Sequence, residues 1–250
     1  IVRVTAAGAT IDGFDINVNN DGARLHAVNA SNGGLTLVNS ILRNGQGSGF
    51  VGNGHYGDNL VERNHIYGFA AGRGVYAGNS YYVTVRNNLM EGIRTGVQTN
   101  NTWLANPGTL PPEMIGNTIR AARTGIFFNL TYSSASSQEI SGNTIVASGW
   151  SDTVGQWQGI WVESLSRPAT IENNDITGPA SAGSTYKHVG YLINNITLET
   201  ANAIVGGTVE HVDIGVLVTD ATYYTGPVEN IAVASVTFED IRDYPLYVED

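Results

Sequence analysis

Several chemically active side chains recur along the chain at fixed distances from a glycine that opens a short apolar segment. If each segment is a β-strand, the residues two before, two after and four after the glycine face outward together. On such a face aromatic rings can stack on a sugar, amides can bind hydroxyl groups, and guanidinium groups can pair with an acidic sugar. The outward residues predicted to bind carbohydrate are Arg94, Gln98, Asn100, Phe127, Asn129, Trp157, Trp161 and Asn194.

Glu163 is the candidate general acid or base, because it is the only carboxylate in the central part of this face. Trp157 and Trp161 would partly desolvate it and raise its pKa. His188 is the candidate partner, and Arg123 would stabilise negative charge that develops during a reaction. A second interpretation needs no ligand, because aromatic side chains in a row also stabilise a sheet by packing between neighbouring strands.

The glycines would leave a strip without side chains, along which a ligand could approach the backbone. They stand at positions 49, 74, 96, 125, 159, 190 and 215. The long loops, residues 147–156 and 178–187, lead into the strands at Trp157 and His188. We expect these loops to form a wall beside Glu163, and we expect any chemistry there.

The strands that must position these residues are indicated by a second repeat: apolar, two residues, Asn, one residue, apolar. Its Asn column runs through positions 14, 39, 64, 88, 117, 143, 174, 207 and 236, with Asn at each position from 39 to 174. Stacked coils of a solenoid bring equivalent positions to about 4.8 Å from one another. A side-chain amide both donates and accepts there, so the column predicts a ladder of hydrogen-bonded asparagines.

The glycine repeat also predicts a continuous core. Each coil buries little alone, and stacking of coils supplies the rest. The residues expected to point inward are Phe50, Val75, Val97, Ile126, Ile160, Tyr191, Val216 and Leu246. The sequence therefore predicts the all-β class, as a parallel β-solenoid of about nine coils in which residues 1–250 form a single domain.

On the Asn column and the glycine column, the chain resembles the right-handed, single-stranded parallel β-helix superfamily. This superfamily includes pectate-lyase-like lyases, epimerases, some glycoside hydrolases, phage tailspikes and repeats of bacterial surface proteins. The resemblance implies that the Asn ladder lies in the short second turn. It also implies that carbohydrate binds along the first sheet, which here is the glycine column.

Several catalytic patterns of that superfamily are missing. The chain has no Asp-Pro-His-Asp motif, no paired Asp-Asp accompanied by His and Arg-x-Lys, and a single lysine, Lys187. Two functions stay open. The first is an extracellular module that binds glycan or serves as a rigid structural or adhesive segment of a large surface or secreted protein. The second is a polysaccharide lyase or glycoside hydrolase that uses the outward face.

The composition of the chain disfavours several classes of partner. With 22 acidic and 12 basic residues, the net charge of −10 disfavours nucleic acid, and it disfavours an acidic polysaccharide unless Ca²⁺ or a local basic patch intervenes. No cofactor is predicted; Ca²⁺ is an option only at the acidic residues near the end of the chain, which more often form a solvated face. No segment approaches the roughly 18 apolar residues that membrane insertion requires. The absence of cysteine fits an exported bacterial protein, so we expect an extracellular or cell-surface location.

The repeat already runs at Ile1 and still runs at Asp250. Solenoid ends usually need polar caps, because an open end exposes backbone and apolar side chains. We therefore expect the chain to be a segment of a longer protein, or copies of it to stack end to end.

Overall fold

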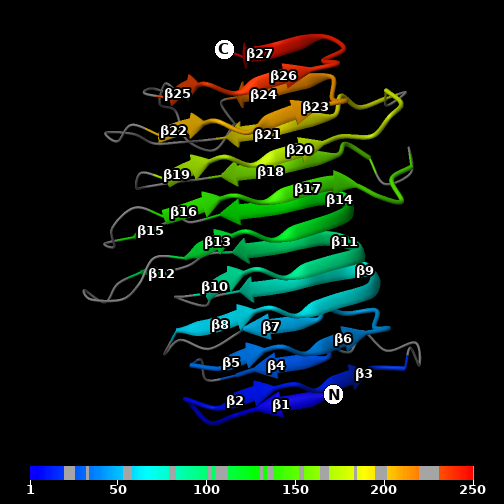
Figure 1. Cartoon of the computed structure of the whole chain (residues 1–250), viewed down its shortest axis with the longest axis vertical. Helices are drawn as coiled ribbons and strands as arrows, with labels where there is room; N and C mark the ends of the chain where they lie inside the picture. Colours follow the sequence, from blue (N-terminus) through cyan, green and yellow to red (C-terminus); the bar gives the residue numbers. More distant parts are fainter. Residues whose placement is uncertain are drawn as a thin grey trace.

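The protein winds into a stack of coils, and each coil lies directly on the one before it (Figure 1). The computed structural model describes residues 1–19, 26–31, 34–52, 58–78, 83–100, 103–104, 112–129, 132–133, 138–151, 155–163, 169–182, 185–194, 202–219 and 231–249. Within these ranges there are strands and no helices, and every strand pairing is parallel. This confirms the all-β parallel solenoid.

One side of the stack is a nine-stranded sheet, to which each coil contributes one short strand. Its strands are β2 (Thr10–Asp12), β5 (Thr36–Val38), β8 (Asn59–Glu62), β10 (Val83–Arg86), β13 (Glu113–Ile115), β16 (Gln138–Ser141), β19 (Ala169–Glu172), β22 (Asn202–Val205) and β25 (Ile231–Ala234). A two-stranded sheet of β12 (Trp103–Leu104) and β15 (Tyr132–Ser133) lies apart from it in the pairing.

The other two sides form a single sixteen-stranded sheet, because three long strands run across both. These strands are β9 (His65–Gly78), β11 (Leu89–Asn100) and β14 (Thr118–Asn129). The side that follows the Asn column consists of β3 (Asp15–Asn17), β6 (Ile41–Arg43), the first halves of the long strands, β17 (Thr144–Ala147), β20 (Asp175–Thr177), β23 (Thr208–Glu210) and β26 (Thr237–Glu239). The side that follows the glycine column, here called the first face, consists of β1 (Val2–Val4), β4 (Val28–Ala30), β7 (Phe50–Gly52), the second halves of the long strands, β18 (Gln158–Glu163), β21 (Val189–Asn194), β24 (Ile214–Thr219) and β27 (Tyr244–Glu249).

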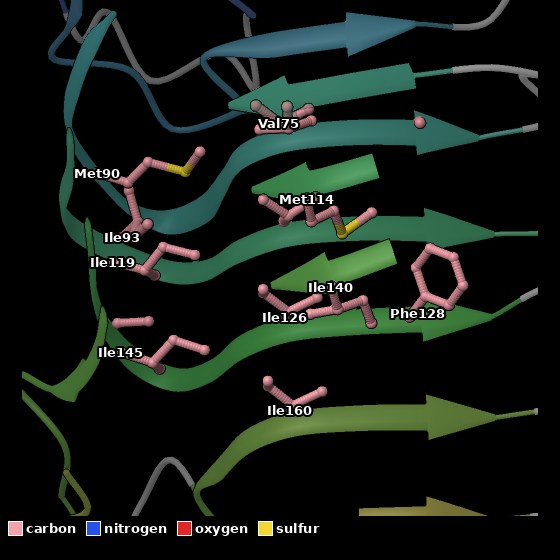
Figure 2. Close-up of a cluster of buried hydrophobic side chains, with 14 of the residues drawn as sticks. Val75, Met90, Ile93, Met114, Ile119, Ile126, Phe128, Ile140, Ile145 and Ile160 are labelled. Atoms are coloured by element: carbon pink, nitrogen blue, oxygen red, sulfur yellow. The ribbon is translucent and has the colours of Figure 1, made fainter. Parts of the chain in front are cut away.

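Apolar side chains fill the space between the sheets as continuous columns (Figure 2). On the first face, Val75, Val97, Ile126 and Ile160 are paired in register from coil to coil, and all are fully buried. The predicted inward column is therefore confirmed along the interior coils. In the last strand, β27, the same column is exposed, with Leu246 50% accessible.

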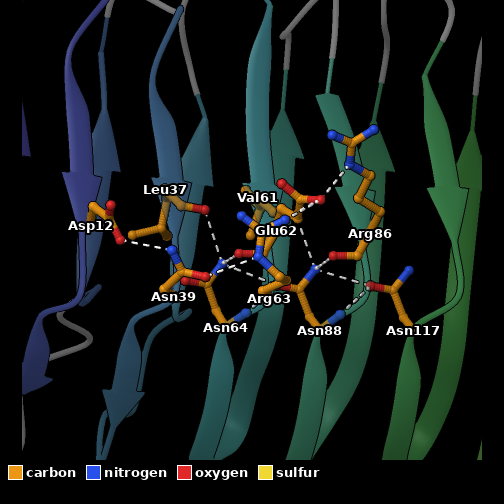
Figure 3. A network of polar contacts seen from close by, with 10 residues as sticks. All are labelled: Asp12, Leu37, Asn39, Val61, Glu62, Arg63, Asn64, Arg86, Asn88 and Asn117. Carbon is orange, nitrogen blue, oxygen red and sulfur yellow. Dashed lines mark hydrogen bonds and ion pairs between the residues drawn. The ribbon is translucent and has the colours of Figure 1, made fainter.

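The asparagine ladder is present and buried (Figure 3). Asn64, Asn88, Asn117 and Asn143 each donate from Nδ2 to Oδ1 of the next asparagine, at 2.9–3.0 Å, and Asn174 receives the last of these bonds. Each accepting oxygen also receives the backbone N–H of the preceding rung, at 2.9–3.1 Å. One column of amides thus ties five coils together.

Asn39 does not belong to this ladder, contrary to the sequence prediction. Ser40 takes its place: the Ser40 backbone N–H donates to Asn64 Oδ1 at 2.9 Å. Asn39 is exposed, with φ of 49°, and its Nδ2 donates to Asp12 Oδ1 at 2.8 Å. In successive coils, the residue directly before the ladder position has a left-handed backbone conformation. Asn tolerates this conformation well. An Asn in the repeat can therefore occupy either the left-handed position or the ladder position.

Replacing Asn117 with Ala is expected to lower the free energy of unfolding by about 2–4 kcal/mol, because each buried group left without a partner costs about 1–3 kcal/mol. Urea denaturation measures the change. Asn17→Ala is the control, since Asn17 is exposed and, among the described residues, accepts from Asn19 and Asn44. An equal loss of unfolding free energy in the two variants would show that the ladder contributes no more to stability than an exposed asparagine.

Candidate functional site

The outward side of the first face carries most of the predicted residues. Gln98, Phe127 and Trp161 are paired in register on β11, β14 and β18, and all are half-buried. Four residues after the glycines, Asn129, Glu163 and Asn194 form a second row. Asn100 lies at the end of β11, where its Oδ1 accepts from Gln98 Nε2 at 2.9 Å.

A groove of about 660 Å³ opens over this face, within the range of ligand-binding pockets. Arginines from three successive coils enter it, together with polar and aromatic side chains and some backbone. Its lining consists of His26, Gln46, Gly47, Ser48, Ala71, Gly72, Arg73, Arg94, Thr95, Gln98, Arg123, Thr124, Phe127 and Trp161. Among these residues there is no carboxylate.

The three arginines of the groove form no ion pair with the described residues, unlike Arg43, Arg63, Arg86, Arg120 and Arg242, each of which contacts a carboxylate. The Arg73 guanidinium lies 4.6 Å from the Tyr76 ring centroid, and its Nε donates to Gln98 Oε1. Burial lowers the pKa of Arg73 and of Arg123, and the charge of Arg94 adds to both effects. Among the described residues, the positive charge of the groove therefore has no paired carboxylate.

An aromatic edge adjoins the arginines. The rings of Phe127 and Trp161 lie with centroids 4.3 Å apart at an interplanar angle of 31°. Trp161 also packs on an apolar cluster outside the main core, formed by Val189, Leu192 and Ile214. Part of the aromatic row therefore stabilises the sheet by packing, as the second interpretation expected, while both rings also line the groove.

Glu163 lies beside the groove rather than in its lining. It is half-buried, and its Oε2 accepts from Asn129 Nδ2 at 3.0 Å. Burial raises the pKa of Glu163, and the bond from Asn129 opposes this. The shift has the direction that the sequence predicted, and Trp161 lies two residues before Glu163 in β18.

Trp157 and His188 do not face outward, and this prediction is wrong for both. Both side chains are completely buried. Trp157 Nε1 donates to the Ala121 carbonyl at 3.2 Å, and its backbone N–H donates to His188 Nδ1 at 3.2 Å. His188 also meets the edge of Trp150, with ring centroids 4.3 Å apart. These side chains hold the corner of the coil together and do not reach the groove.

The reason is a corner in the chain just before each glycine, which interrupts the alternation of a straight strand. In β11 the pairing register shifts between Ile93 and Thr95. Arg94 and Arg123 stay in the groove, as predicted, but the residues directly before the glycines, Arg73, Thr95 and Thr124, join them there. The sequence rule missed these three residues because it counted two positions back.

The glycine column faces the core, so the predicted strip for a ligand is also wrong. A Cβ atom on Gly125 would lie 2.3 Å from Cγ2 of Ile145 and 2.5 Å from the Gly159 carbonyl oxygen. A Cβ atom on Gly159 would lie 2.5 Å from Cγ2 of Ile176. Glycine is required because two sides of the sixteen-stranded sheet approach closely at the corner.

His26 is a groove residue that the sequence did not indicate. Its Nδ1 accepts the Ser48 backbone N–H at 2.9 Å, so the neutral ring carries its proton on Nε2. Burial, with the charge of Arg73, lowers the pKa of His26 and favours this neutral form. The positive charge of the groove at neutral pH therefore comes from arginine.

The carboxylates considered for Ca²⁺ are engaged elsewhere or lie outside the described residues. Asp213 binds Arg242 at 2.6 Å, Asp243 binds Lys187 at 2.6 Å, and Glu249 accepts from Thr219 at 3.1 Å. Residues 220 and 250 are outside the described ranges. In the part of the chain that the structure covers, no three metal-ligating side chains cluster together, and no helix is long and apolar enough to cross a membrane.

Comparison with known proteins identifies the family. The model for the right-handed β-helix region matches residues 1–198, so the chain belongs to this family of right-handed parallel β-helices. No curated protein matches the sequence.

The solved structures that match the chain include a glucanase domain and a phage tailspike. The catalytic domain of a GH87 alpha-1,3-glucanase, in complex with tetrasaccharides, has a TM-score of 0.56 and 11% identity over 98% of this chain and 53% of its own. The tailspike protein of E. coli bacteriophage HK620, in complex with a pentasaccharide, has a TM-score of 0.45 and 13% identity over 97% of this chain and 56% of its own. The chain thus spans about half the length of these proteins.

Glu163 is expected to titrate above the usual pKa of glutamate, and Asn129→Ala should raise its pKa further by removing a hydrogen bond to the charged form. Carbon-13 NMR of the side-chain carboxyl measures both. Glu91 is the internal reference, because hydrogen bonds from His65 and Arg120 lower its pKa. A Glu163 pKa that falls in the Asn129 variant would contradict the assignment.

Proposed function

We propose that the chain is an extracellular β-helix module that binds carbohydrate in the groove on the outward side of the first face. The observation that carries the proposal is the groove itself, in which aromatic rings stand beside side chains that bind hydroxyl groups. A sugar has an apolar face that stacks on Phe127 and Trp161, and hydroxyls that Gln98, Thr95 and Thr124 can bind. The saccharide complex of the similar glucanase supports this assignment.

The coils would act as a rigid support for this site. Backbone pairing and the Asn ladder fix the strands that carry the groove residues, so little ordering of these strands is needed on binding. This arrangement suits a structural or adhesive segment of a larger surface or secreted protein. Stacking with further coils or with like subunits stays a prediction, as does the bacterial origin.

A second candidate function is cleavage of a polysaccharide, favoured by the raised pKa of Glu163 beside the groove. A raised pKa favours the protonated carboxyl group, which is the form that donates a proton to a leaving group. Arg123 would stabilise developing negative charge from the groove lining. His188 cannot contact a substrate from its buried position, so this scheme relies on Glu163 without the predicted partner.

Trp161→Ala and Phe127→Ala are each expected to weaken glycan binding about tenfold, since loss of ring stacking costs about 0.5–1.5 kcal/mol in addition to the lost buried area. A glycan array followed by calorimetry measures binding. Tyr247→Ala is the control, because Tyr247 lies in the same row on β27, outside the groove lining. Unchanged affinity in both groove variants, with unchanged melting temperature, would place the binding site elsewhere.

Turnover separates the two candidate functions. The wild-type chain is incubated with uronic-acid and neutral polysaccharides, and unsaturated products and new reducing ends are measured. For an enzyme, Glu163→Gln should reduce turnover by at least about 100-fold, the lower range for removal of a general acid or base, while binding is retained. Binding without turnover by the wild type supports the module, and full turnover by Glu163→Gln would remove Glu163 from the chemistry.

A further inference from the structure

We infer that the groove selects an acidic sugar, whose anionic group is held by Arg73, Arg94 and Arg123. This inference rests on the proposed function and names the class of sugar that the site binds. A neutral glycan would use the rings, the hydroxyls and the amide of the groove, but it would bring no counterion to three guanidinium groups that pair with no carboxylate in the described part of the chain. An acidic glycan satisfies both parts of the lining.

The charge distribution supports this choice. The chain carries a net charge of −10, yet the described lining of a groove with three cations includes no acidic side chain. Elsewhere in the described chain, Arg43, Arg86, Arg120 and Arg242 are each neutralised by a carboxylate within 3.0 Å. A cluster of like charges without counterions destabilises the free protein, so a bound anion would stabilise it.

The placement of the arginines supports a bound anion as well. They come from β9, β11 and β14, which are adjacent strands in one parallel sheet, so neighbouring coils are separated by about 4.8 Å. All three side chains line the same groove, so their guanidinium groups can share one carboxylate or sulfate, or bind such groups on successive sugars. The Arg73 guanidinium is held by Gln98 and lies against Tyr76, which limits the ordering needed when a ligand binds.

The same lining favours a sugar over a nucleic acid. A nucleic acid presents a long row of phosphates, and the acidic remainder of this surface would repel it. An acidic oligosaccharide can place its charge at the arginines and the apolar face of a ring on Phe127 and Trp161. The local basic patch thus overcomes the objection to acidic sugars that the overall charge raises.

The test is an array of uronate, sialylated and sulfated oligosaccharides, together with the neutral counterparts of each, including carboxyl-reduced forms. We expect the glycans that bind to be acidic, and their affinity to fall as salt rises. Preference for carboxylated or for sulfated members identifies the source of the anion. Equal binding of acidic and neutral counterparts would overturn the inference while leaving carbohydrate binding intact, whereas no binding to any member would overturn the proposed function and the inference with it.

Arg94→Gln and Arg123→Gln should each weaken binding of the acidic glycan at least about tenfold. Arg120→Gln is the matched control, since it makes the same change of charge on β14 at an exposed residue paired with Glu91 and outside the lining. Without ligand, the two groove variants should melt no lower than the wild type, because they relieve repulsion. An equal loss of affinity in Arg120→Gln would show that overall charge explains the effect, and it would contradict a binding site for the anion in the groove.

Discussion

In this protein each coil is held by hydrogen bonds to the same positions of the next coil, and this register is the constraint on which everything else depends. Backbone pairing sets it, the buried file of amides from Asn64 to Asn174 fixes it at the turn, and inward side chains such as Val97, Ile126 and Ile160 fill one continuous core because of it. A shift of one residue would move every inward side chain to the surface. The groove exists because the same register brings Arg73, Arg94 and Arg123 to one side of the stack.

The architecture could be predicted from the sequence because the Asn column and the glycine column both recur at regular spacing along the chain. Asn64, Asn88, Asn117, Asn143 and Asn174 recur with apolar neighbours at constant offsets, and the structure stacks them as expected. Asn39 was misplaced because two adjacent turn positions both accept Asn, one for its tolerance of a left-handed backbone and one for its amide.

The site was less predictable because it lies at a corner. Alternation predicts faces correctly within a strand, as it did for Phe127, Trp161 and Glu163. Ahead of the glycines the chain bends, and Trp157 and His188 turn inward to fill the corner. The bend shifts the pairing register there, and spacing along the chain does not show that shift. That Arg73 and His26 line the groove follows from the three-dimensional arrangement of the coils and could not be predicted from spacing.

A few charged residues are enough to give one surface of a protein a charge opposite to that of the whole chain. Three arginines, each from a separate coil, create a positive region on a protein with ten more negative than positive charges. Because each of these coils contributes one arginine, the number of coils that contribute sets the length of the positive region. A β-helix in which the next coil also placed an arginine in the groove would accommodate a longer anionic chain, without any change in the fold that carries it.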